Sequence, residues 1–255
     1  MERQFEGQTA VISGGLGDIG FATAKALANR GANVALCDLQ TEAAAAEQLR
    51  ALEPYHVNYS YGQVDVADAS AVRQWVDRVT AAWGTPSLII ANAAKVTLKG
   101  MYELTPSEWT DELDVNLNGA FHLTQYATGL LKEQQRPGRV VFVGSWAGAN
   151  VHQHMPAYSV SKAAMTMLCK CMALELALHG ILVNEIAPGY VNAGLSGRIW
   201  EENPGRSEIA KGKVPIKAVM SAAEVAENIV FLCHPNNTHM TGSTLLMDGG
   251  LSLKY

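Results

Sequence analysis

A tyrosine and a lysine four residues apart form the most specific chemical signal in this sequence. Tyr158 and Lys162 lie in a stretch that is predicted to be helical, so this spacing places both side chains on one helical face. A free tyrosine has a pKa of about 10, and a nearby ammonium group favours the phenolate. A Tyr–Lys pair on a helix is by itself most often a pair of solvent-exposed side chains without a catalytic role. Ser145, which ends a valine-rich run 13 residues before Tyr158, favours a general acid/base site instead, because it could donate a hydrogen bond to a substrate oxygen.

A glycine-rich turn, residues 13–20, follows the first apolar run. Its glycines let a phosphate group approach the backbone, and the helix that follows offers free N–H groups and partial positive charge. Asp38 ends the second apolar run, 24 positions beyond Gly14. A carboxylate there can accept hydrogen bonds from a ribose diol and would repel a 2′-phosphate. Because no Arg or Lys occurs between Ala32 and Ala46, these residues predict NAD rather than NADP as the cofactor.

Short apolar runs alternate with longer helical stretches along the chain. The expected strands are a run leading to Asp65 together with Thr9–Ser13, Asn33–Asp38, Ser87–Asn92, Arg139–Gly144, Ile181–Ile186 and Thr244–Met247. The expected helices include Asp18–Arg30, Thr41–Leu52, residues 69–83, residues 106–132 and Pro156–His179, and capping signals begin at Thr105 and Ser221. This alternation predicts an α/β fold with a mostly parallel sheet and helices on both faces.

Length and composition narrow the class of protein. The chain has 255 residues, of which 48% are hydrophobic and 17% charged, and we expect one domain over residues 1–255. A net charge of −5 without a dense basic block argues against a nucleic-acid partner, and no apolar run is long enough to cross a membrane. The first residues lack a secretory signal, the four cysteines form no Cys-x-x-Cys pair and no metal constellation stands out, so we expect a cytoplasmic protein without a metal.

A long irregular segment, Asn192–Val214, interrupts the alternation and contains Gly194, Gly197, Pro204 and Gly205. It follows a strand, and sheets of this type bind ligands at the carboxyl edge, so the segment is predicted to cover the substrate. An ordinary surface insertion is the alternative.

These motifs together resemble the short-chain dehydrogenase/reductase family over about residues 8 to 250. The resemblance implies a Rossmann-like, doubly wound sheet of seven strands. The family's usual Thr-Gly-x-x-x-Gly-x-Gly turn maps to Ser13, Gly14, Asp18 and Gly20, so Asp18 replaces a glycine. We expect Gly17 to supply part of the lost flexibility, Asp18 to turn away and cap the helix, and the amides around Ile19 to take the pyrophosphate.

Further positions match the family's pattern. Asp65-Val66 resembles its adenine-contacting pair, Asn92-Ala93-Ala94 its Asn-Ala-Gly segment, and Pro188-Gly189 its Pro-Gly turn, while Ala193 stands where the family usually carries Thr. The resemblance implies a catalytic set of Asn116, Ser145, Tyr158 and Lys162, with Asn118 as the second choice for the asparagine. The implied cofactor-binding residues are Gly14, Gly17, Asp18, Ile19, Asp38, Leu39, Asp65, Val66, Asn92, Tyr158, Lys162, Pro188 and Val191.

The family pattern implies an NAD-dependent oxidoreductase that interconverts a secondary alcohol, a polyol or a cyclic alcohol with its ketone. Lys162 would hold the ribose hydroxyls. A homo-oligomer is expected, with a tetramer favoured. Two alternatives stay open at this stage, a non-catalytic NAD-sensing or scaffold protein on the same fold and an NADP-dependent ketone reductase. The implied substrate pocket includes Ala94, Val96, Ala147, Gly148, His152, His154, Met155, Tyr190, Leu195, Ile199 and Trp200.

Overall fold

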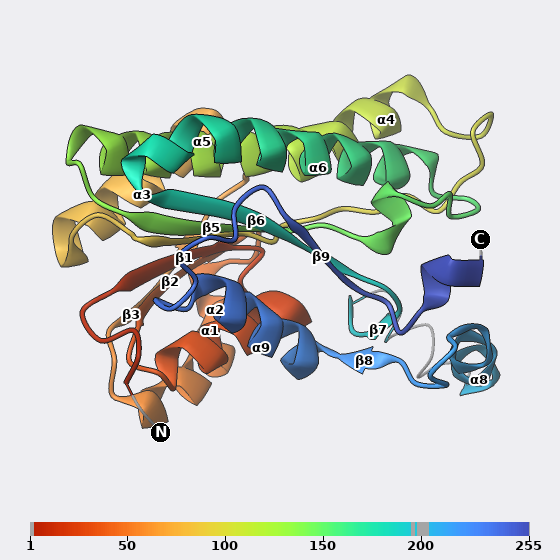
Figure 1. Ribbon diagram of the computed structural model, residues 1–255, viewed down its shortest axis with the longest axis horizontal. Coiled ribbons are helices and arrows are strands. Elements are labelled where there is room, and N and C mark those ends of the chain that lie inside the picture. The colour runs from red at the N-terminus through yellow and green to blue at the C-terminus, as the bar shows by residue number, and fades with distance from the viewer. Residues whose placement is uncertain (1–2, 195–196, 198–203, 255) are drawn as a thin grey trace.

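Seven parallel strands form the central sheet of the computed structural model, which describes residues 3–194, 197 and 204–254 (Figure 1). The strands lie in the order β3-β2-β1-β4-β5-β6-β9, and every neighbouring pair is parallel. Their bounds are β1 Thr9–Ser13, β2 Asn33–Asp38, β3 Tyr59–Gln63, β4 Leu88–Ala91, β5 Gly138–Val143, β6 Ile181–Pro188 and β9 Thr244–Met247. The order turns back on itself at β1, so the predicted doubly wound α/β fold is confirmed.

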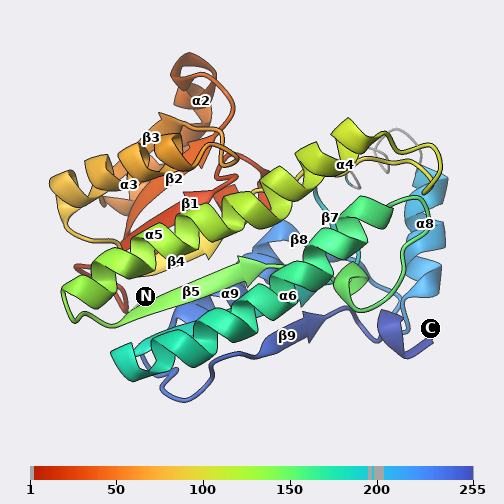
Figure 2. The same ribbon diagram turned by 90° about the horizontal axis from the view of Figure 1, so that it is seen from above.

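Helices cover both faces of this sheet. One face carries α3 (Ala69–Trp83), α5 (Gly119–Glu133) and α6 (Pro156–Leu176), and the other carries α1 (Asp18–Ala28), α2 (Glu42–Leu49) and α9 (Ala222–Cys233) (Figures 1 and 2). Helix α4 (Pro106–Leu113) extends α5 beyond the sheet. None of the described helices combines the length and apolarity that a membrane span requires.

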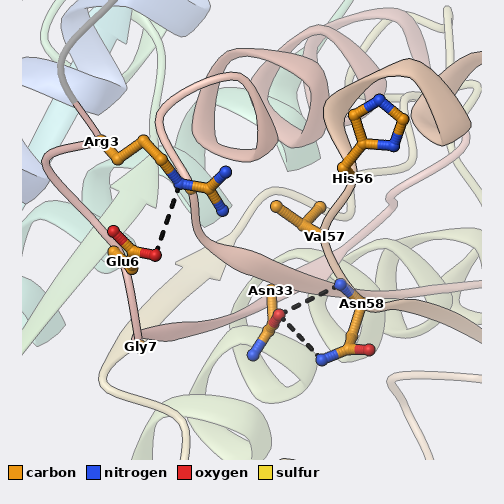
Figure 3. A pocket seen from close by; sticks show the side chains of 8 residues that line it. Arg3, Glu6, Gly7, Asn33, His56, Val57 and Asn58 are labelled. Carbon is orange, nitrogen blue, oxygen red and sulfur yellow. Dashed lines mark hydrogen bonds and ion pairs between the residues drawn. The ribbon is translucent and has the colours of Figure 1, made fainter.

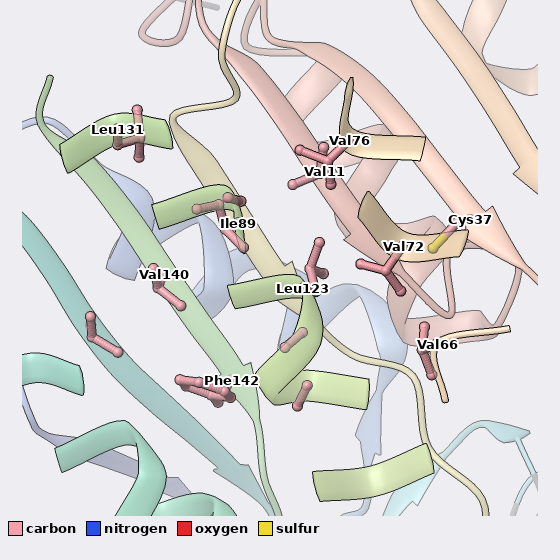
Figure 4. Close-up of a cluster of buried hydrophobic side chains, with 14 of the residues drawn as sticks. Val11, Cys37, Val66, Val72, Val76, Ile89, Leu123, Leu131, Val140 and Phe142 are labelled. Carbon is pink, nitrogen blue, oxygen red and sulfur yellow. The ribbon is translucent and has the colours of Figure 1, made fainter. Parts of the chain in front are cut away.

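Alternation along the strands produces two apolar layers. Val11, Ile89 and Phe142 point into the layer beneath α3, α5 and α6, several of whose members are drawn in Figure 4. Their neighbours Ile12 and Ile90 point into the opposite layer, beneath α1 and α9. Burial on both faces explains the continuous apolar runs. Because all seven strands run parallel, their carboxyl ends lie along one edge of the sheet, and this edge bears the candidate site.

Helix boundaries follow the local signals, with two informative departures. The capping boxes at Thr105 and Ser221 are confirmed, and Asp68 accepts hydrogen bonds from the first amides of α3. The helix expected over 106–132 is broken by a π-helical turn, Asp114–Asn118, between α4 and α5. The helix expected over Thr41–Leu52 ends at Leu49 and continues as a 3-10 turn that contains Pro54. π-Helical turns are frequent at functional sites, and this one carries Asn116.

The irregular segment after β6 is described in part. Strand β7 (Val191–Asn192) pairs in parallel with β8 (Met220–Ser221), and α8 (Pro204–Lys213) lies between them in the chain. Residues 195–196 and 198–203 of the predicted covering segment lie outside the described part of the chain. The arrangement of β7 and β8 fixes where the segment leaves and rejoins the fold.

Candidate active site

The glycine-rich turn between β1 and α1 forms one wall of the candidate site. Gly14 has a φ of +61°, and a Cβ there would lie 2.8 Å from the Cα of Ala93. A Cβ at Gly20 would lie 2.2 Å from the carbonyl oxygen of Gly14. No side chain caps the first backbone N–H groups of α1, so these groups can donate hydrogen bonds to an anion. This backbone cradle suits a pyrophosphate, as the sequence predicted.

Asn92 braces this turn from the neighbouring strand. Its side-chain amide donates hydrogen bonds to the carbonyl oxygens of Ser13 and Gly14 at 3.1 and 2.9 Å. The Ser13 hydroxyl in turn accepts hydrogen bonds from the backbone N–H groups of Asn92 and Ala93. The side chain of Asn92 is therefore engaged in holding the end of β1 to the end of β4. Its direct contribution to a ligand would come from the backbone around it.

The expected capping role of Asp18 is wrong. Gly17 occupies the N-cap position with extended backbone angles, and Asp18 is the first helical residue. No side chain caps this helix, and the Asp18 carboxylate accepts a hydrogen bond from the N–H of Gly194 at 2.6 Å instead. The carboxylate is thus turned away from the helix N-terminus, as expected, but it ties the turn to the segment that follows β7. Asp18 and Gly194 are 176 residues apart in the sequence, so no local pattern could predict this hydrogen bond.

Asp38 lies beside the same turn. Its carboxylate accepts hydrogen bonds from the N–H of Leu16 at 3.1 Å and from the N–H of Leu39 at 2.8 Å. Each carboxylate oxygen keeps a further lone pair. Leu39 itself is 62% exposed and stands next to this carboxylate. The end of β2 therefore presents a negative charge and an apolar side chain beside the glycine turn.

The remaining predicted cofactor residues lie along the same edge of the sheet. Asp65 is exposed and accepts a hydrogen bond from the N–H of Ala67 at 2.9 Å. Val66 is buried, and its carbonyl oxygen bonds to the His122 ring at 3.0 Å, so Val66 packs against α5 more than it faces solvent. Pro188 ends β6, and Val191 begins β7. The fold brings these positions to one edge of the sheet.

Ser145, Tyr158 and Lys162 come together at the carboxyl end of β5. Ser145 has extended backbone angles directly after β5, and its hydroxyl lies near enough to Tyr158 to lower the pKa of the phenol. Tyr158 and Lys162 occupy one face of α6, with the Lys162 Nζ 5.5 Å from the centre of the Tyr158 ring. The predicted grouping of these residues is therefore what the structure has. A hydroxyl pair poised to share one substrate oxygen is the chemistry that it offers.

Burial raises the pKa of Tyr158 in the cofactor-free protein. The neighbouring Ser145 hydroxyl lowers the pKa, and the negative charge of Glu112 raises it further. The spacing of Tyr158 and Lys162 predicted a lowered pKa, because the charge of the lysine alone favours the phenolate. Tyr158 is partly buried, and desolvation penalises the phenolate more strongly than the sequence could indicate. The protein without cofactor holds Tyr158 as the neutral phenol near neutral pH.

Lys162 is 1% exposed, and its Nζ donates a hydrogen bond to the carbonyl oxygen of Val143 at 2.7 Å. Burial lowers the pKa of Lys162 to about 8, while the carboxylates of Glu185 and Glu112 raise it. The ammonium is thus anchored to β5 and keeps two donors for other groups. A buried ammonium of this kind is a point charge fixed behind the phenol.

Asn116 occupies the π-helical turn and is fully buried. Its side chain exchanges two hydrogen bonds with the backbone of Lys95, at 2.7 and 2.9 Å, and donates a third to the Ser161 hydroxyl at 3.0 Å. Asn118 bonds to Asp114 in an exposed position. The structure therefore places Asn116, and not the second choice, against α6. Its amide joins the loop after β4 to the helix that carries Tyr158.

Two buried carboxylates near Lys162 were missed by the sequence reasoning. Glu185 lies in β6 and accepts hydrogen bonds from the hydroxyls of Thr166 at 3.0 Å and Thr244 at 2.7 Å. Glu112 lies in α4, and both carboxylates are fully buried. Two signals could have found them. Glu185 is a charge within a mostly apolar strand, and Glu112 precedes Asn116 by one helical turn, hence on the same face.

Replacing Gly144 by alanine should destabilise the protein by about 1–3 kcal/mol. A Cβ there would lie 1.9 Å from Oε1 of Glu185, and that oxygen is held by the Thr166 hydroxyl. We expect the melting temperature to fall by roughly 3–10 °C in thermal unfolding followed by circular dichroism. Gly129→Ala in α5, where a Cβ meets nothing within 4 Å, is the matched control and should be neutral or slightly stabilising. Equal melting temperatures for the two variants would contradict this account.

Aromatic side chains lie beside Ser145. The rings of Trp146, His152 and Tyr190 are mutually edge-on, with centres 5.7 to 6.4 Å apart. Trp146 packs with Val214 and Leu251, so the aromatic cluster rests on the C-terminal segment. Three further residues of the predicted substrate pocket, Leu195, Ile199 and Trp200, lie outside the described part of the chain. The described wall next to Ser145 is accordingly aromatic, with one imidazole as a hydrogen-bonding group.

A separate surface hollow of about 340 Å³ lies at the opposite edge of the sheet (Figure 3). Arg3, Asn33 and His56 line it, and Asn33 is the first residue of β2. This hollow is therefore at the amino ends of the strands, away from Tyr158. Its polar groups are largely engaged with one another, since Asn33 accepts two hydrogen bonds from Asn58. The hollow shares no residue with the candidate site.

Comparison with known proteins gives consistent matches over nearly the full length of the protein. A family model described as enoyl-(acyl carrier protein) reductase matches residues 15–252. A galactitol 2-dehydrogenase of Rhizobium johnstonii is 33% identical, and the match covers 98% of this protein and 96% of the relative. A 2,3-dihydro-2,3-dihydroxybenzoate dehydrogenase of Bacillus subtilis is 30% identical, and the match covers 97% of both proteins.

Solved structures show the same likeness in three dimensions. The crystal structure of an NAD⁺-bound xylitol dehydrogenase has a TM-score of 0.91 at 28% identity and covers 97% of this protein and all of that one. A putative 2-deoxy-D-gluconate 3-dehydrogenase from Agrobacterium tumefaciens with bound NADP has a TM-score of 0.89 at 27% identity, and the match covers 98% of both proteins. With this match, the parallel sheet and the glycine turn at its carboxyl edge, the protein belongs to the short-chain dehydrogenase/reductase family, whose fold binds a nicotinamide cofactor, and it is an oxidoreductase.

Proposed function

We propose that this protein is an NAD-dependent dehydrogenase that interconverts a secondary alcohol with its ketone, and that Tyr158 is its general acid/base. The observation that carries the proposal is the grouping of Ser145, Tyr158 and the buried Lys162 at the carboxyl end of β5, with the Lys162 Nζ 5.5 Å from the centre of the Tyr158 ring. The two hydroxyls stand at the carboxyl edge of the sheet, close to the glycine turn along the same edge. The reacting oxygen of a substrate is the group that such a pair would bind.

The preference for NAD over NADP rests on Asp38. The backbone N–H groups of Leu16 and Leu39 hold its carboxylate beside the glycine turn. The carboxylate can therefore accept hydrogen bonds from the two hydroxyls of an adenosine ribose. A 2′-phosphate at the same place would meet this negative charge. Arg30, the cation that precedes β2, is paired with Glu227 at 2.6 Å and is thus committed elsewhere. Solved neighbours hold either cofactor, so the choice has to be argued from this local charge.

The reaction needs one proton to move at a defined atom. A bound nicotinamide supplies the hydride acceptor in oxidation and the hydride donor in reduction. In oxidation the Tyr158 oxygen takes the hydroxyl proton of the alcohol, and in reduction it returns a proton to the ketone oxygen. Ser145 donates its hydrogen bond to the same substrate oxygen and orients it. The Lys162 ammonium stabilises the phenolate and offers its remaining donors to ribose hydroxyls, and Asn116 holds the adjoining loop in place.

The proposed substrate class is a polyol or a cyclic secondary alcohol. The aromatic wall of Trp146, His152 and Tyr190 provides apolar faces for the C–H groups of a ring or of a linear polyol, and the imidazole can bond a second hydroxyl. Relatives that act on galactitol and on a dihydroxylated ring support this class by their names. We further propose that residues 1–255 form one domain in which the segment at 192–214 covers the substrate, and that the protein is a homo-oligomer.

The test is a turnover assay with each cofactor. The purified protein is mixed with NAD⁺ or NADP⁺ and a panel of linear polyols, cyclic diols and simple secondary alcohols, and the absorbance of the reduced cofactor is recorded. We expect turnover with NAD⁺ on at least one hydroxylated substrate. Cofactor binding by tryptophan fluorescence quenching without turnover on any substrate would favour the non-catalytic alternative, and a faster reaction with NADP⁺ would refute the role given to Asp38.

The two directions should respond oppositely to pH. Burial raises the pKa of Tyr158, so the neutral phenol that donates to a ketone dominates near neutral pH, and the phenolate that accepts from an alcohol becomes more populated as pH rises. We expect the kcat of alcohol oxidation to increase with pH above neutrality and the kcat of ketone reduction to decrease over the same range. Initial rates in both directions across a buffer series measure this. Parallel profiles would argue that another group transfers the proton.

A further inference from the structure

Glu112 is a buried carboxylate that the proposed reaction does not use. Its side chain is fully buried in α4, and Oε2 accepts a hydrogen bond from the N–H of Thr97 at 3.0 Å. Oε1 is also buried and has no hydrogen-bond partner among the described residues. Burying a carboxylate with one oxygen left unpaired is unfavourable unless an opposite charge compensates for it. The positions of the nearby cations therefore indicate which group the Glu112 carboxylate interacts with.

Glu112 lies at the junction of the elements that form the site. It precedes Asn116 by one helical turn, and both α4 and the π-helical turn pack against α6, the helix of Tyr158 and Lys162. Its partner Thr97 belongs to the loop after β4, two residues beyond the Lys95 backbone that Asn116 bonds. Glu112 and Asn116, on adjacent helical turns, thus both hold the loop after β4 by hydrogen bonds to its backbone.

Two cations act on this carboxylate, Lys95 of the loop after β4 and Lys162 of the candidate site. Burial raises the pKa of Glu112, whereas hydrogen bonding with Thr97 and then the charges of Lys95 and Lys162 lower it. In return the charge of Glu112 raises the pKa of both Tyr158 and Lys162. Glu185 of β6 is the other carboxylate that acts on Lys162, and it is already paired with two threonine hydroxyls. On its own helix Asp111 is exposed and pairs with Lys95.

We propose that Glu112 is a positioning residue of the active site, ionised in the working enzyme, which balances the buried charge of Lys162 and ties the loop after β4 to the helix of Asn116. The proposal rests on the function proposed above for Tyr158 and Lys162. It adds a carboxylate whose charge sets how readily the Tyr158 proton leaves. The charges of Glu112 and Lys162 act on each other across the packed helices α4 and α6, without a hydrogen bond or ion pair between the two described side chains.

The test removes the charge and keeps the shape. In Glu112→Gln the amide oxygen still accepts the Thr97 N–H, but the negative charge that opposes the phenolate is gone. We expect the pH at which alcohol oxidation rises to move lower by about one unit. Any alkaline decline caused by loss of the Lys162 proton should also move lower, since Glu112 stabilises that ammonium. A purely structural role would reduce the rate without moving either feature.

A second readout does not depend on turnover. The ultraviolet absorbance of tyrosinate is recorded against pH for the cofactor-free protein and for its Tyr158→Phe counterpart, and the difference isolates Tyr158. Its midpoint should be lower in Glu112→Gln than in the parent by about one unit. Glu112→Met, which is similar in length and apolar, should give the same direction, and it serves if the glutamine variant fails to fold. Thermal unfolding establishes that each variant is folded.

Asp111→Asn is the matched control, because it removes a negative charge from the adjacent, exposed position of the same helix. It should leave the Tyr158 midpoint unchanged, since water screens an exposed charge. An unshifted midpoint in folded Glu112→Gln or Glu112→Met, or an equal shift in Asp111→Asn, would overturn the proposal. If the parent protein turns over no alcohol while the Tyr158 midpoint still shifts in Glu112→Gln, the proposed function fails and the electrostatic coupling stands.

Discussion

Replacing Tyr158 by phenylalanine is expected to lower the turnover of alcohol oxidation and of ketone reduction by roughly a thousandfold or more. The substitution removes one hydroxyl and keeps the ring that lies 5.5 Å from the Lys162 Nζ. Ser145 can still hydrogen-bond a substrate oxygen, but a serine hydroxyl is a much weaker acid than a phenol and cannot replace it as acid or base. The measurement is kcat for both directions by absorbance of the reduced cofactor.

Binding separates this effect from a loss of structure. The affinity of Tyr158→Phe for NADH, measured by quenching of tryptophan fluorescence, should remain close to that of the parent because Asp38 and the glycine turn are untouched. Tyr126→Phe removes a hydroxyl that bonds Asp77 between α5 and α3, and it serves as a control with normal turnover. Near-normal kcat in Tyr158→Phe would defeat the assignment of the general acid/base.

Replacing Asp38 by asparagine is expected to shift the preference between NADH and NADPH by roughly a hundredfold. The loss of charge weakens the hydrogen bonds to the ribose diol, which costs NADH affinity, and it removes the repulsion that opposes a 2′-phosphate. The asparagine oxygen can still accept one of the two amides, from Leu16 or Leu39, that fix the carboxylate in the parent. Dissociation constants for both reduced cofactors, taken by fluorescence titration, measure the shift.

A nearby charge provides the comparison. Glu47→Gln removes an exposed carboxylate from α2 and should leave the ratio of the two dissociation constants unchanged. A parent protein that binds NADPH more tightly than NADH, or an Asp38→Asn variant with an unaltered ratio, would show that this carboxylate does not select the cofactor.

Local patterns were sufficient to predict most of the scaffold. Continuous apolar runs predicted buried parallel strands, and β1, β2 and β9 have the predicted bounds. The capping boxes at Thr105 and Ser221 are properties of four consecutive residues, so no tertiary information was needed to find them. The i, i+4 spacing of Tyr158 and Lys162 likewise fixed their shared face.

Other features depended on partners that are remote in sequence. Asp18 bonds Gly194, and Glu185 is held by Thr244, so neither contact has a local signature. The π-helical turn at Asn116 is a further case, because its amide is satisfied by the backbone of Lys95 and by Ser161 on another helix. Tertiary hydrogen bonds stabilise this irregular turn where local propensity alone predicts an uninterrupted helix.

The sequence by itself determined the α/β class and the order of the elements, because both follow from periodicity and capping. A short spacing put Tyr158 and Lys162 on one face, and the resemblance to the short-chain dehydrogenase/reductase family implied most of the other residues that meet at the carboxyl edge. Only the tertiary structure decided the electrostatics of Tyr158. Burial and the carboxylate of Glu112 raise its pKa, while the Lys162 ammonium is itself desolvated and anchored to β5. Desolvation depends on what surrounds a group in space, and that surrounding is assembled from α4, α6, β5 and β6 only when the protein folds.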